Sequence, residues 1–274
     1  MNEKTWSDEV SSGDRFEFGR NWSRFLKKID AAGVDAAERS LKEMLQVDSL
    51  NGSTFLDIGC GSGLFSLAAR RLGAVVTSFD FDPNSVACTN ELRRRFYPGD
   101  AAWTVMTGSV LDDQLINTLE EFDVVYSWGV LHHTGRMWRA IGNAGSRVRP
   151  GGKLFIALYN QQPFATSYWT VIKKLYNRFR TLRPLLIVVH LVYPTLISVV
   201  LRLLSGRELP RGMSVWYDLI DWLGGYPFET ARPDDVVNHF VDGGYSVVRI
   251  KTVGGRLGCN EYVFRKSGQQ ALVR

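Results

Sequence analysis

The feature that most constrains the fold is a regular alternation of short apolar runs with amphipathic stretches over residues 53–160. Each apolar run has the length of one β-strand, whereas each amphipathic stretch repeats its apolar residues at the spacing of a helix with one buried face. Two strands joined through a helix form a right-handed crossover, which makes the strands parallel. The alternation therefore predicts an α/β fold with a doubly wound, mostly parallel sheet. The apolar runs are TFLDI, VVTSF, WTVM, FDVVYSW and KLFIALYN.

The chain is organised differently on either side of this alternation. Residues 11–46 have helical spacing, which predicts an N-terminal helical cap over residues 1–50. After Asn160, apolar and basic residues recur at helical spacing, and the α/β pattern resumes only with a further helix and the strands YSVVRIK and NEYVF. We therefore expect one α/β domain over residues 51–274, with a helical insertion at about 161–230.

The opening of the chain and its cysteines narrow the class further. The start MNEKTWSDEV is polar and acidic, unlike a secretory leader, so we expect a cytoplasmic protein. Cys60, Cys88 and Cys259 are widely spaced and include no C-x-x-C pair, which argues against a disulfide framework or a zinc site. We expect reduced thiols and no metal.

Basic residues dominate the predicted insertion and its flanks. The chain carries a formal net charge of +5, and between residues 153 and 211 its charged residues are all basic except Glu208. Such a block is often a solvated face, but it can also meet nucleic acid or an anionic membrane surface. The basic residues are Lys153, Lys173, Lys174, Arg178, Arg180, Arg183, Arg202, Arg207 and Arg211.

The apolar run from Leu185 to Leu204 leaves three arrangements open. Its length of about 20 residues matches a bilayer span, but a sheet that resumes afterwards has to stay on the same side as its first half. Pro194 can break the run into a helical hairpin that packs on the core or in a homodimer. The same helices can instead rest on the inner membrane face while the basic flanks meet anionic lipid, a peripheral contact over residues 169–204.

The stretch Asp57-Ile-Gly-Cys-Gly-Ser-Gly-Leu64 ends the first predicted strand in a glycine-rich turn. A dinucleotide fingerprint starting at Gly59 needs glycine at position 64, and a P-loop needs Gly-Lys at positions 64 and 65, but the chain has Leu64 and Phe65. What remains is a turn that lets a ligand approach bare backbone, with Asp57 to accept hydrogen bonds from a ligand amine. Asp80 ends the next strand, where a carboxylate can bind both hydroxyls of a ribose. The pattern therefore indicates a ligand with a ribose and a cationic amine and no required phosphate.

Four segments of the sequence, in order, resemble the motif series of class I S-adenosylmethionine (SAM)-dependent methyltransferases. They are FLDIGCGSG, VVTSFD, FDVVYSWGVLHHTG and RVRPGGKLFIALYN, and the resemblance covers about residues 53–160. The family implies SAM as the cofactor and a Rossmann-like sheet of seven strands, of which the last runs antiparallel. The two late strands, near Tyr245 to Lys251 and Asn260 to Phe264, would supply the edge of that sheet.

The resemblance also implies which residues hold SAM. Asp57 and the glycines after it line the methionyl part, and Asp80 binds the ribose, whereas Asp82 falls in the cap of the next helix. Where the family often has an acidic residue to meet the adenine amine, this chain has Ser109, so Ser109 and the Val110 backbone take that place. The full set expected at the cofactor is Asp57, Gly59, Gly61, Gly63, Asp80, Phe81, Ser109, Val110 and Ser127.

His132 and His133 follow the fourth predicted strand, at the edge where open α/β sheets place their chemistry. A histidine titrates near neutrality and could accept the proton of a hydroxyl acceptor, so we expect one of the pair, His133 before His132, to be the catalytic base. Either histidine could equally cap the loop or pack beside the cofactor. The other polar candidates are Tyr159, Asn160, Asp218, Asp221 and Glu261.

Two functions follow from these observations. The favoured one is transfer of a methyl group from SAM to a small molecule, at a hydroxyl of a saccharide, lipid-linked intermediate or natural product. The chain lacks an Asn/Asp-Pro-Pro-Tyr/Phe motif after the fourth strand, which argues against methylation of DNA or glutamine. The alternative is an RNA methyltransferase that binds nucleic acid through the basic insertion, although the basic residues alternate with aliphatic runs and not with stacking aromatics.

Overall fold

The computed structural model describes residues 5–19, 29–191, 220 and 222–268, and the chain forms two compact units. The sheet unit comprises Phe18–Pro163 and Glu229–Arg274, and the insertion unit comprises Met1–Glu17 and Phe164–Phe228. The start of the chain and the segment before Phe228 therefore belong to one unit, although a long stretch of sequence separates them. The predicted division into a cap, a domain and an insertion stays a prediction.

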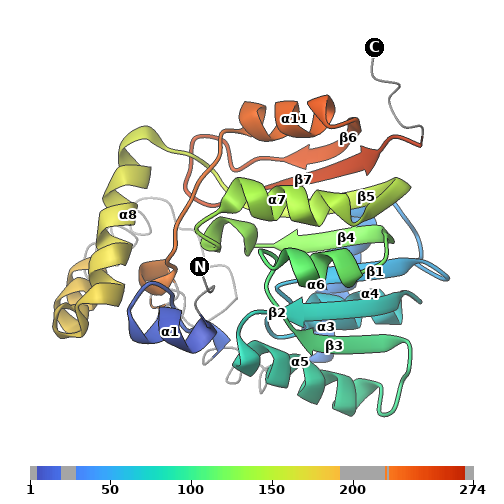
Figure 1. Ribbon diagram of the computed structural model, residues 1–274, viewed down its shortest axis with the longest axis horizontal. Coiled ribbons are helices and arrows are strands. Elements are labelled where there is room, and N and C mark those ends of the chain that lie inside the picture. Colours follow the sequence, from blue (N-terminus) through green and yellow to red (C-terminus); the bar gives the residue numbers. More distant parts are fainter. Residues whose placement is uncertain (1–4, 20–28, 192–219, 221, 269–274) are drawn as a thin grey trace, which may run out of the picture. The chain divides into compact units, whose positions relative to one another are not determined.

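Seven strands form one sheet in the order β3-β2-β1-β4-β5-β7-β6 (Figure 1). Neighbouring strands are parallel from β3 through β5, and β7 is antiparallel to both β5 and β6. The predicted doubly wound sheet with one antiparallel strand is confirmed, and β7 makes the sheet mixed. The strands are β1 (Thr54–Ile58), β2 (Val75–Asp80), β3 (Trp103–Thr107), β4 (Phe122–Trp128), β5 (Val148–Tyr159), β6 (Tyr245–Lys251) and β7 (Cys259–Lys266).

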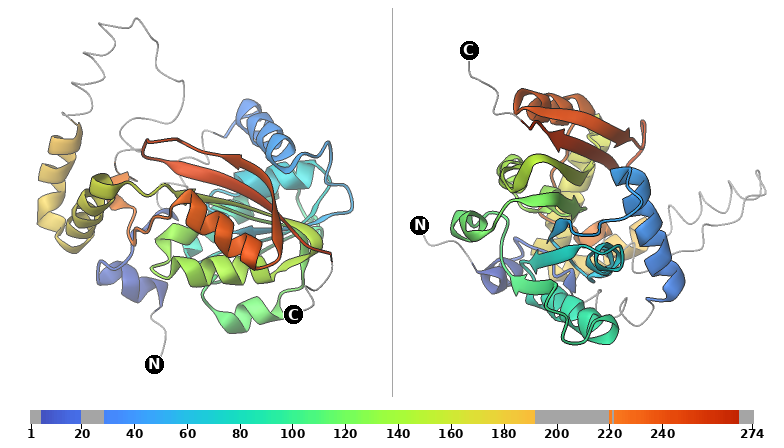
Figure 2. Two further views of the ribbon diagram at one scale, coloured as in Figure 1. Left: turned by 90° about the horizontal axis from the view of Figure 1, so that it is seen from above. Right: turned by 90° about the vertical axis from the view of Figure 1, so that its right-hand side faces the viewer.

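Helices of the sheet unit cover both faces of this sheet (Figure 2). Phe55 and Leu56 of β1 belong to different hydrophobic clusters, because successive side chains of a strand point to opposite faces. Leu67 of α4 packs in the cluster of Phe55, and Ile141 of α7 packs in the cluster of Leu56. The helices are α3 (Ala31–Leu45), α4 (Leu64–Arg71), α5 (Pro83–Phe96), α6 (Asp113–Thr118), α7 (Met137–Ser146) and α11 (Pro233–Asp242).

The helices that follow β2 and β3 each begin at an aspartate N-cap. Asp82 caps α5 by accepting a hydrogen bond from the Asn84 backbone N–H, and Pro83 occupies the first turn, where its missing N–H costs nothing. This confirms the expectation that Asp82 lies in the helix cap. Asp112 caps α6 in the same way. By contrast, α4 begins directly after Gly63, which has no side chain to cap it.

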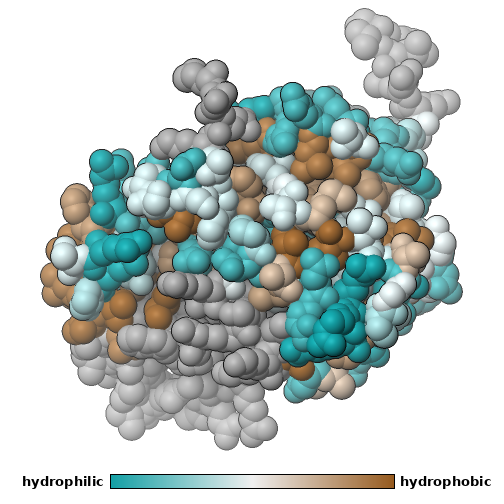
Figure 3. Space-filling model, turned by 60° about the horizontal axis from the view of Figure 1, so that its bottom comes forward, coloured by the Kyte–Doolittle hydropathy of each residue, from teal (hydrophilic) through white to brown (hydrophobic). Residues whose placement is uncertain are grey.

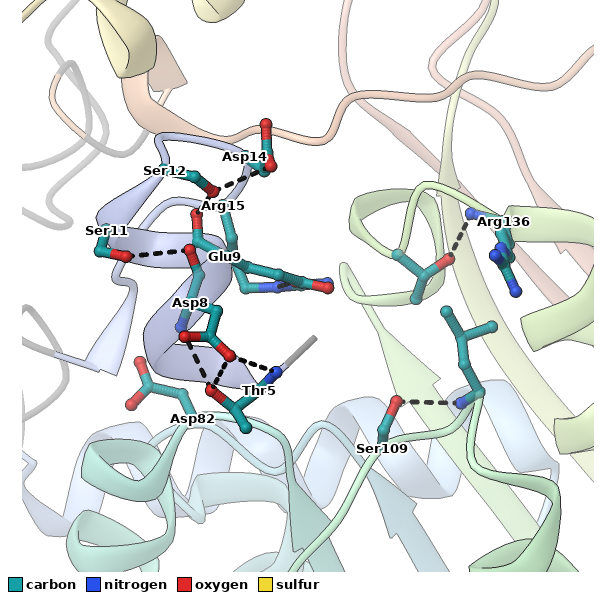
Figure 4. Close-up of polar contacts among 12 residues, drawn as sticks. Thr5, Asp8, Glu9, Ser11, Ser12, Asp14, Arg15, Asp82, Ser109 and Arg136 are labelled. Atoms are coloured by element: carbon teal, nitrogen blue, oxygen red, sulfur yellow. Dashed lines mark hydrogen bonds and ion pairs between the residues drawn. The ribbon is translucent and has the colours of Figure 1, made fainter. Parts of the chain in front are cut away.

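The insertion unit contains α1 (Trp6–Ser11), α8 (Pro163–Arg178), the 3-10 turn η3 (Arg180–Leu182) and a helical segment at residues 183–191. Thr5 and Asp8 point toward one another at the start of α1, where they form a capping box (Figure 4). Pro194 and the rest of residues 192–204 lie outside the described residues, so the predicted hairpin stays a prediction. Among the helices that the structure describes, none is long and apolar enough to cross a membrane.

Lys173 departs from the expectation that it meets anionic lipid. Its side chain is fully buried in the insertion unit, where Nζ donates to the Trp222 carbonyl oxygen. Nζ also lies 4.3 Å from the centre of the Trp222 ring and 4.8 Å from that of Phe228. Burial lowers the pKa of Lys173 to about 7. The expectation is wrong for this residue because the long aliphatic stem carries its amine into an aromatic cluster and not to the surface.

Candidate active site

The turn after β1 is built from glycines because its backbone takes conformations that other residues avoid. Gly59, Gly61 and Gly63 have φ values of 76°, 54° and 80°. A Cβ on Gly59 would lie 2.4 Å from a methyl carbon of Val130, so Val130 packs directly on the glycine. The strand order reverses between β1 and β4, and ligands of open α/β sheets bind outside the carboxyl ends of such strands. The glycine turn therefore presents bare backbone at the place where a ligand is expected.

Asp80 is anchored to this turn by its carboxylate. Oδ2 accepts a hydrogen bond from the Gly61 backbone N–H at 2.9 Å, and Oδ1 accepts one from the Asp82 N–H at 2.9 Å. The side chain is half-buried at the end of β2. A carboxylate oxygen has two lone pairs and can accept more than one hydrogen bond.

Asp57 lies deeper than the other acidic groups of the site. It is 2% exposed, and its Oδ2 accepts a hydrogen bond of 2.5 Å from the Ser66 hydroxyl on α4. Burial raises the pKa of Asp57 to about 7, and the neighbouring Asp80 carboxylate adds to the rise, whereas the Ser66 hydrogen bond opposes it. The expected contact of Asp57 with a ligand amine stays a prediction.

Two of the other expected cofactor residues, Ser109 and Ser127, already make hydrogen bonds within the protein. Ser109 Oγ accepts from the Leu111 N–H at 3.1 Å (Figure 4), and the Ser127 hydroxyl donates to the Ile58 carbonyl oxygen at 2.9 Å. Ser127 is fully buried, and Val110 belongs to the hydrophobic core. Phe81 follows Asp80 and is half-buried. The binding roles assigned to these residues from sequence stay predictions.

His132 and His133 form a 3-10 turn, η2 (Leu131–His133), that is seated beside the glycine turn. The His133 backbone N–H donates to the carbonyl oxygen of Val130, the residue that packs on Gly59. His132 is fully buried, and its Nδ1 accepts from the Tyr159 N–H at 3.3 Å. His133 is 7% exposed, and its ring lies 4.5 Å from that of His132 and 5.4 Å from that of Tyr159.

A short segment before α3 reaches both ends of this site. The Gly19 backbone N–H donates to Asp82 Oδ2 at 2.8 Å, and the Phe18 ring lies 5.1 Å from the His133 ring. Residues 18 and 19 thus connect the ends of β2 and β4. The sequence carries no short-range signal for these contacts, since Gly19 and Asp82 are 63 positions apart.

Comparison with known protein families supplies the identification. A family model described as a methyltransferase domain matches residues 21–185. The chain belongs to this methyltransferase family. The match spans the glycine turn, Asp80 and the two histidines, and it confirms the methyltransferase family that the sequence predicted.

The methyltransferase is similar to curated proteins over part of their length. It is 28% identical over 138 residues to a ubiquinone biosynthesis O-methyltransferase of Coxiella burnetii (strain Dugway 5J108-111), which covers 48% of this chain and 54% of the relative. It is 31% identical over 120 residues to the protein of the same name from Methylobacterium sp. (strain 4-46), with 44% and 46% covered. The chain therefore spans about half the length of the curated relatives it matches.

A solved structure shares the fold. The methyltransferase superposes on a magnesium protoporphyrin IX methyltransferase from Synechocystis PCC 6803, solved with bound SAM, with a TM-score of 0.56 and 14% sequence identity. The match covers 97% of this chain and all of the other. At this identity the likeness supports the fold alone.

The residues of the methyltransferase fit SAM. The positive φ values of the three glycines leave a surface of bare backbone, and the Asp80 carboxylate is hydrogen-bonded to the Gly61 N–H of that turn. The expected contacts of the methionyl part with the glycine turn and of the ribose with Asp80 stay predictions. When bound there, SAM supplies an electrophilic methyl group on a sulfonium, and the protein has to orient the acceptor and remove its proton.

The sequence did not point to Glu229, which forms hydrogen bonds with both η2 and α7. Both Glu229 carboxylate oxygens accept from the Met137 N–H, at 3.0 and 3.2 Å, and cap a helix whose own N-cap residue, Arg136, makes no side-chain cap. The Glu229 N–H donates to the His132 carbonyl oxygen at 2.9 Å. Because these contacts join residues more than 90 positions apart, no local pattern could have predicted them.

Two of the remaining polar candidates make structural contacts, and two more lie outside the described residues. The Asn160 side chain donates to the Gly254 carbonyl oxygen and accepts from the Asn260 side-chain amide, and these bonds hold the loop before β7. Glu261 lies 3.7 Å from Lys251 in an ion pair across β6 and β7. Asp218 and Asp221 lie outside the described residues.

Proposed function

We propose that this methyltransferase transfers the methyl group of SAM to a hydroxyl of a small molecule. The observation that supports the proposal is that Val130 packs on Gly59 and accepts a hydrogen bond from the His133 N–H, so the histidine turn adjoins the glycine turn where we propose that SAM binds. The names of the curated relatives, ubiquinone biosynthesis O-methyltransferases, support an oxygen acceptor. An oxygen nucleophile has to lose its proton as the methyl group moves, so a general base assists it.

We assign the role of base to His133 before His132. The Nδ1 of His132 already accepts the Tyr159 N–H in a fully buried position, which suits a residue that holds the loop. His133 retains some exposure and is held by ring contacts with Phe18, Tyr159 and His132. These contacts restrict the ring of His133.

The first test replaces His133 with glutamine and follows methyl transfer to phenolic and alcohol acceptors. We expect kcat to fall about 100- to 10,000-fold, because a general base contributes that much, while affinity for the demethylated product S-adenosylhomocysteine (SAH) stays within a few-fold. The matched control is His239→Gln, since His239 lies exposed on α11 against the Trp138 ring. Unchanged turnover in His133→Gln would contradict the role of His133.

A second measurement decides the acceptor class. Label from methyl-labelled SAM is followed into hydroxyl-bearing small molecules, lipid extract and total RNA in parallel. Incorporation into small molecules or lipid supports the proposal. Incorporation into RNA alone would favour the RNA methyltransferase alternative, with the basic residues of the insertion as its binding surface.

We further propose that the insertion unit makes peripheral contact with anionic lipid. Large apolar side chains of α8 and of residues 183–191 are exposed, among them Phe164 at 92% and Leu185 at 60%. Brown, hydrophobic residues gather at the left of Figure 3, on the side where α8 is drawn in Figure 1. Exposed basic residues accompany them, namely Lys174, Arg178 and Arg180. Apolar surface beside cationic side chains is the combination that binds an anionic membrane interface.

A further inference from the structure

A chain of buried hydrogen bonds runs through the sheet unit and ends at Asp57. The Trp103 indole N–H donates to Ser78 Oγ at 3.0 Å, the hydroxyl oxygens of Ser78 and Ser66 lie 2.7 Å apart, and Ser66 Oγ donates to Asp57 Oδ2. Trp103, Ser78 and Ser66 are fully buried. The four residues come from β3, β2, α4 and β1, so the chain links three adjacent strands and the helix beside the glycine turn.

The groups at the two ends of this hydrogen-bond series decide which partner donates in each bond. An indole N–H can only donate, so Ser78 accepts from Trp103. With Asp57 ionised, Ser78 donates to Ser66 and Ser66 donates to Asp57, and each hydroxyl proton has an acceptor. With a proton on Asp57 Oδ2, the Ser66 hydroxyl has to turn toward Ser78, and the Ser78 proton then loses its acceptor within the chain. An unpaired buried hydroxyl is costly, and a carboxyl protonated on Oδ1 instead would accept the Ser66 hydrogen bond less strongly than a carboxylate does. For both reasons the hydrogen-bond chain favours the ionised form of Asp57.

The position of Asp57 at the start of α4 acts in the same direction. Ser66 is the third residue of α4, whose N-cap Gly63 offers no side-chain acceptor, and the Ser66 backbone lowers the pKa of Asp57 as its hydroxyl does. Free N–H groups at a helix N-terminus stabilise a nearby anion. Burial and the Asp80 carboxylate oppose both effects. Asp57 thus lies between a desolvation penalty that favours protonation and a set of donors that favours ionisation.

The other titratable groups around Asp57 do not supply a positive charge. Asp80 is the neighbouring carboxylate, and it interacts with Asp57 from the end of β2. Cys60 in the turn and Tyr126 on β4 both have pKa values raised well above the ordinary value by burial, so each stays neutral around pH 7. The hydrogen-bond chain and the helix start are therefore the described groups that favour an ionised Asp57.

We propose that Ser66, Ser78 and Trp103 are positioning residues that keep Asp57 ionised and oriented at the glycine turn, and that they thereby set the pH at which the SAM site binds its ligand tightly. The inference rests on the proposed place of Asp57 beside the methionyl part of SAM. A cationic ligand amine binds an ionised Asp57 better than a protonated one. Removing a hydrogen bond from the Trp103–Ser78–Ser66–Asp57 series therefore shifts the pH range of tight SAM binding upward.

The test measures SAH affinity by calorimetry between about pH 5.5 and 9. Ser66→Ala removes the donor to Asp57, and we expect the midpoint of its pH profile to rise by about one unit, with affinity about tenfold weaker near pH 6.5 and equal to that of the unaltered protein near pH 9. Ser78→Ala and Trp103→Phe should shift the midpoint in the same direction by progressively smaller amounts. The matched control is Ser85→Ala, a serine 1% exposed on α5 and outside the chain, which keeps the original profile. A Ser66→Ala profile that coincides with the original, or an affinity loss that is the same at every pH, would overturn the proposal.

A second readout needs no ligand and separates this inference from the function it rests on. Carbon-13 NMR titration follows the Asp57 carboxyl in the ligand-free protein, with Asp57→Asn to assign the signal. We expect the midpoint to rise in Ser66→Ala, and an unchanged midpoint would refute the effect of the chain on Asp57. A raised midpoint together with unchanged SAH affinity in both Ser66→Ala and Asp57→Asn would refute the place of Asp57 at the cofactor. Neither result depends on which acceptor is methylated.

Discussion

At the scale of single residues, the site depends on which polar groups are already occupied. Asp80 accepts from the Gly61 N–H of the glycine turn and from the Asp82 N–H. Asp82 accepts from the backbone N–H groups of Gly19 and Asn84, and Asp57 accepts from the Ser66 hydroxyl. The three aspartates differ in burial and in their hydrogen-bond partners. Their different roles follow from those partners, because an ionised carboxylate can only accept hydrogen bonds and bonds whichever donors surround it.

Asp80→Ala tests the assignment of the ribose. The change removes a charged acceptor from two ligand hydroxyls and from the Gly61 N–H, so we expect SAH binding to weaken by about 2 to 4 kcal/mol in calorimetry. Asp112→Ala is the matched control, since Asp112 caps α6 with the same kind of hydrogen bonds and should leave SAH affinity unchanged. Equal affinity in Asp80→Ala and the unaltered protein would contradict the assignment.

At the scale of elements, α8 contains a lysine that the insertion unit keeps out of water. Lys173 lies over the rings of Trp222 and Phe228, and Asn177, one turn later, donates to the Gly224 carbonyl oxygen at 2.7 Å. The two contacts hold the segment before Phe228 against α8. Aromatic rings and one carbonyl oxygen are a weak substitute for water around an ammonium group, and the lowered pKa reflects this.

Lys173→Met tests how much this burial costs. Between its folded pKa of about 7 and its ordinary value of 10.5, the lysine is protonated in the unfolded chain and neutral in the folded one, so stability rises with pH across that window. Below pH 7 the full penalty remains. We therefore expect the free energy of unfolding of Lys173→Met at pH 6 to exceed that of the unaltered protein by on the order of a few kcal/mol. This difference should shrink toward pH 10.

Denaturant unfolding followed by tryptophan fluorescence measures this difference at both pH values. Lys174→Met is the control, because Lys174 is exposed next to Lys173 and its replacement should change the free energy of unfolding by less than about 0.5 kcal/mol. A gain of equal size at both pH values would show that packing, and not the charge of Lys173, is responsible.

At the scale of the whole molecule, the proposed membrane contact predicts salt-dependent binding to anionic vesicles. Each basic residue near such a surface contributes about 1 kcal/mol, so Lys174/Arg178/Arg180→Glu should weaken co-sedimentation at least about 100-fold. The control carries the same charge change on exposed residues of the sheet unit, Arg232/Arg256/Arg265→Glu, and should bind as the unaltered protein does. No binding to any vesicle, together with a light-scattering mass of two chains, would instead place the apolar residues in a homodimer.

Much of the sheet unit could be predicted because its signals are local. The apolar alternation specifies strands and crossover helices through neighbours a few residues apart, and it predicted the seven strands and the reversed strand β7 once the family resemblance was added. The glycine turn was equally readable, because the need for positive φ restricts residue choice at Gly59, Gly61 and Gly63 themselves. The cap of α5 at Asp82 belongs to the same group, since its partner Asn84 is two residues away.

Only the tertiary structure decided which side chains are buried and what they bond. The sequence placed Lys173 among surface basic residues, and packing against Trp222 buried it. The contacts of Gly19 with Asp82 and of Glu229 with Met137, like the path from Trp103 to Asp57, join residues far apart in the chain. Burial and partner choice depend on how whole elements pack, whereas helices, strands and turns depend mainly on near neighbours, and that difference in range separates what this sequence determined alone from what required the fold.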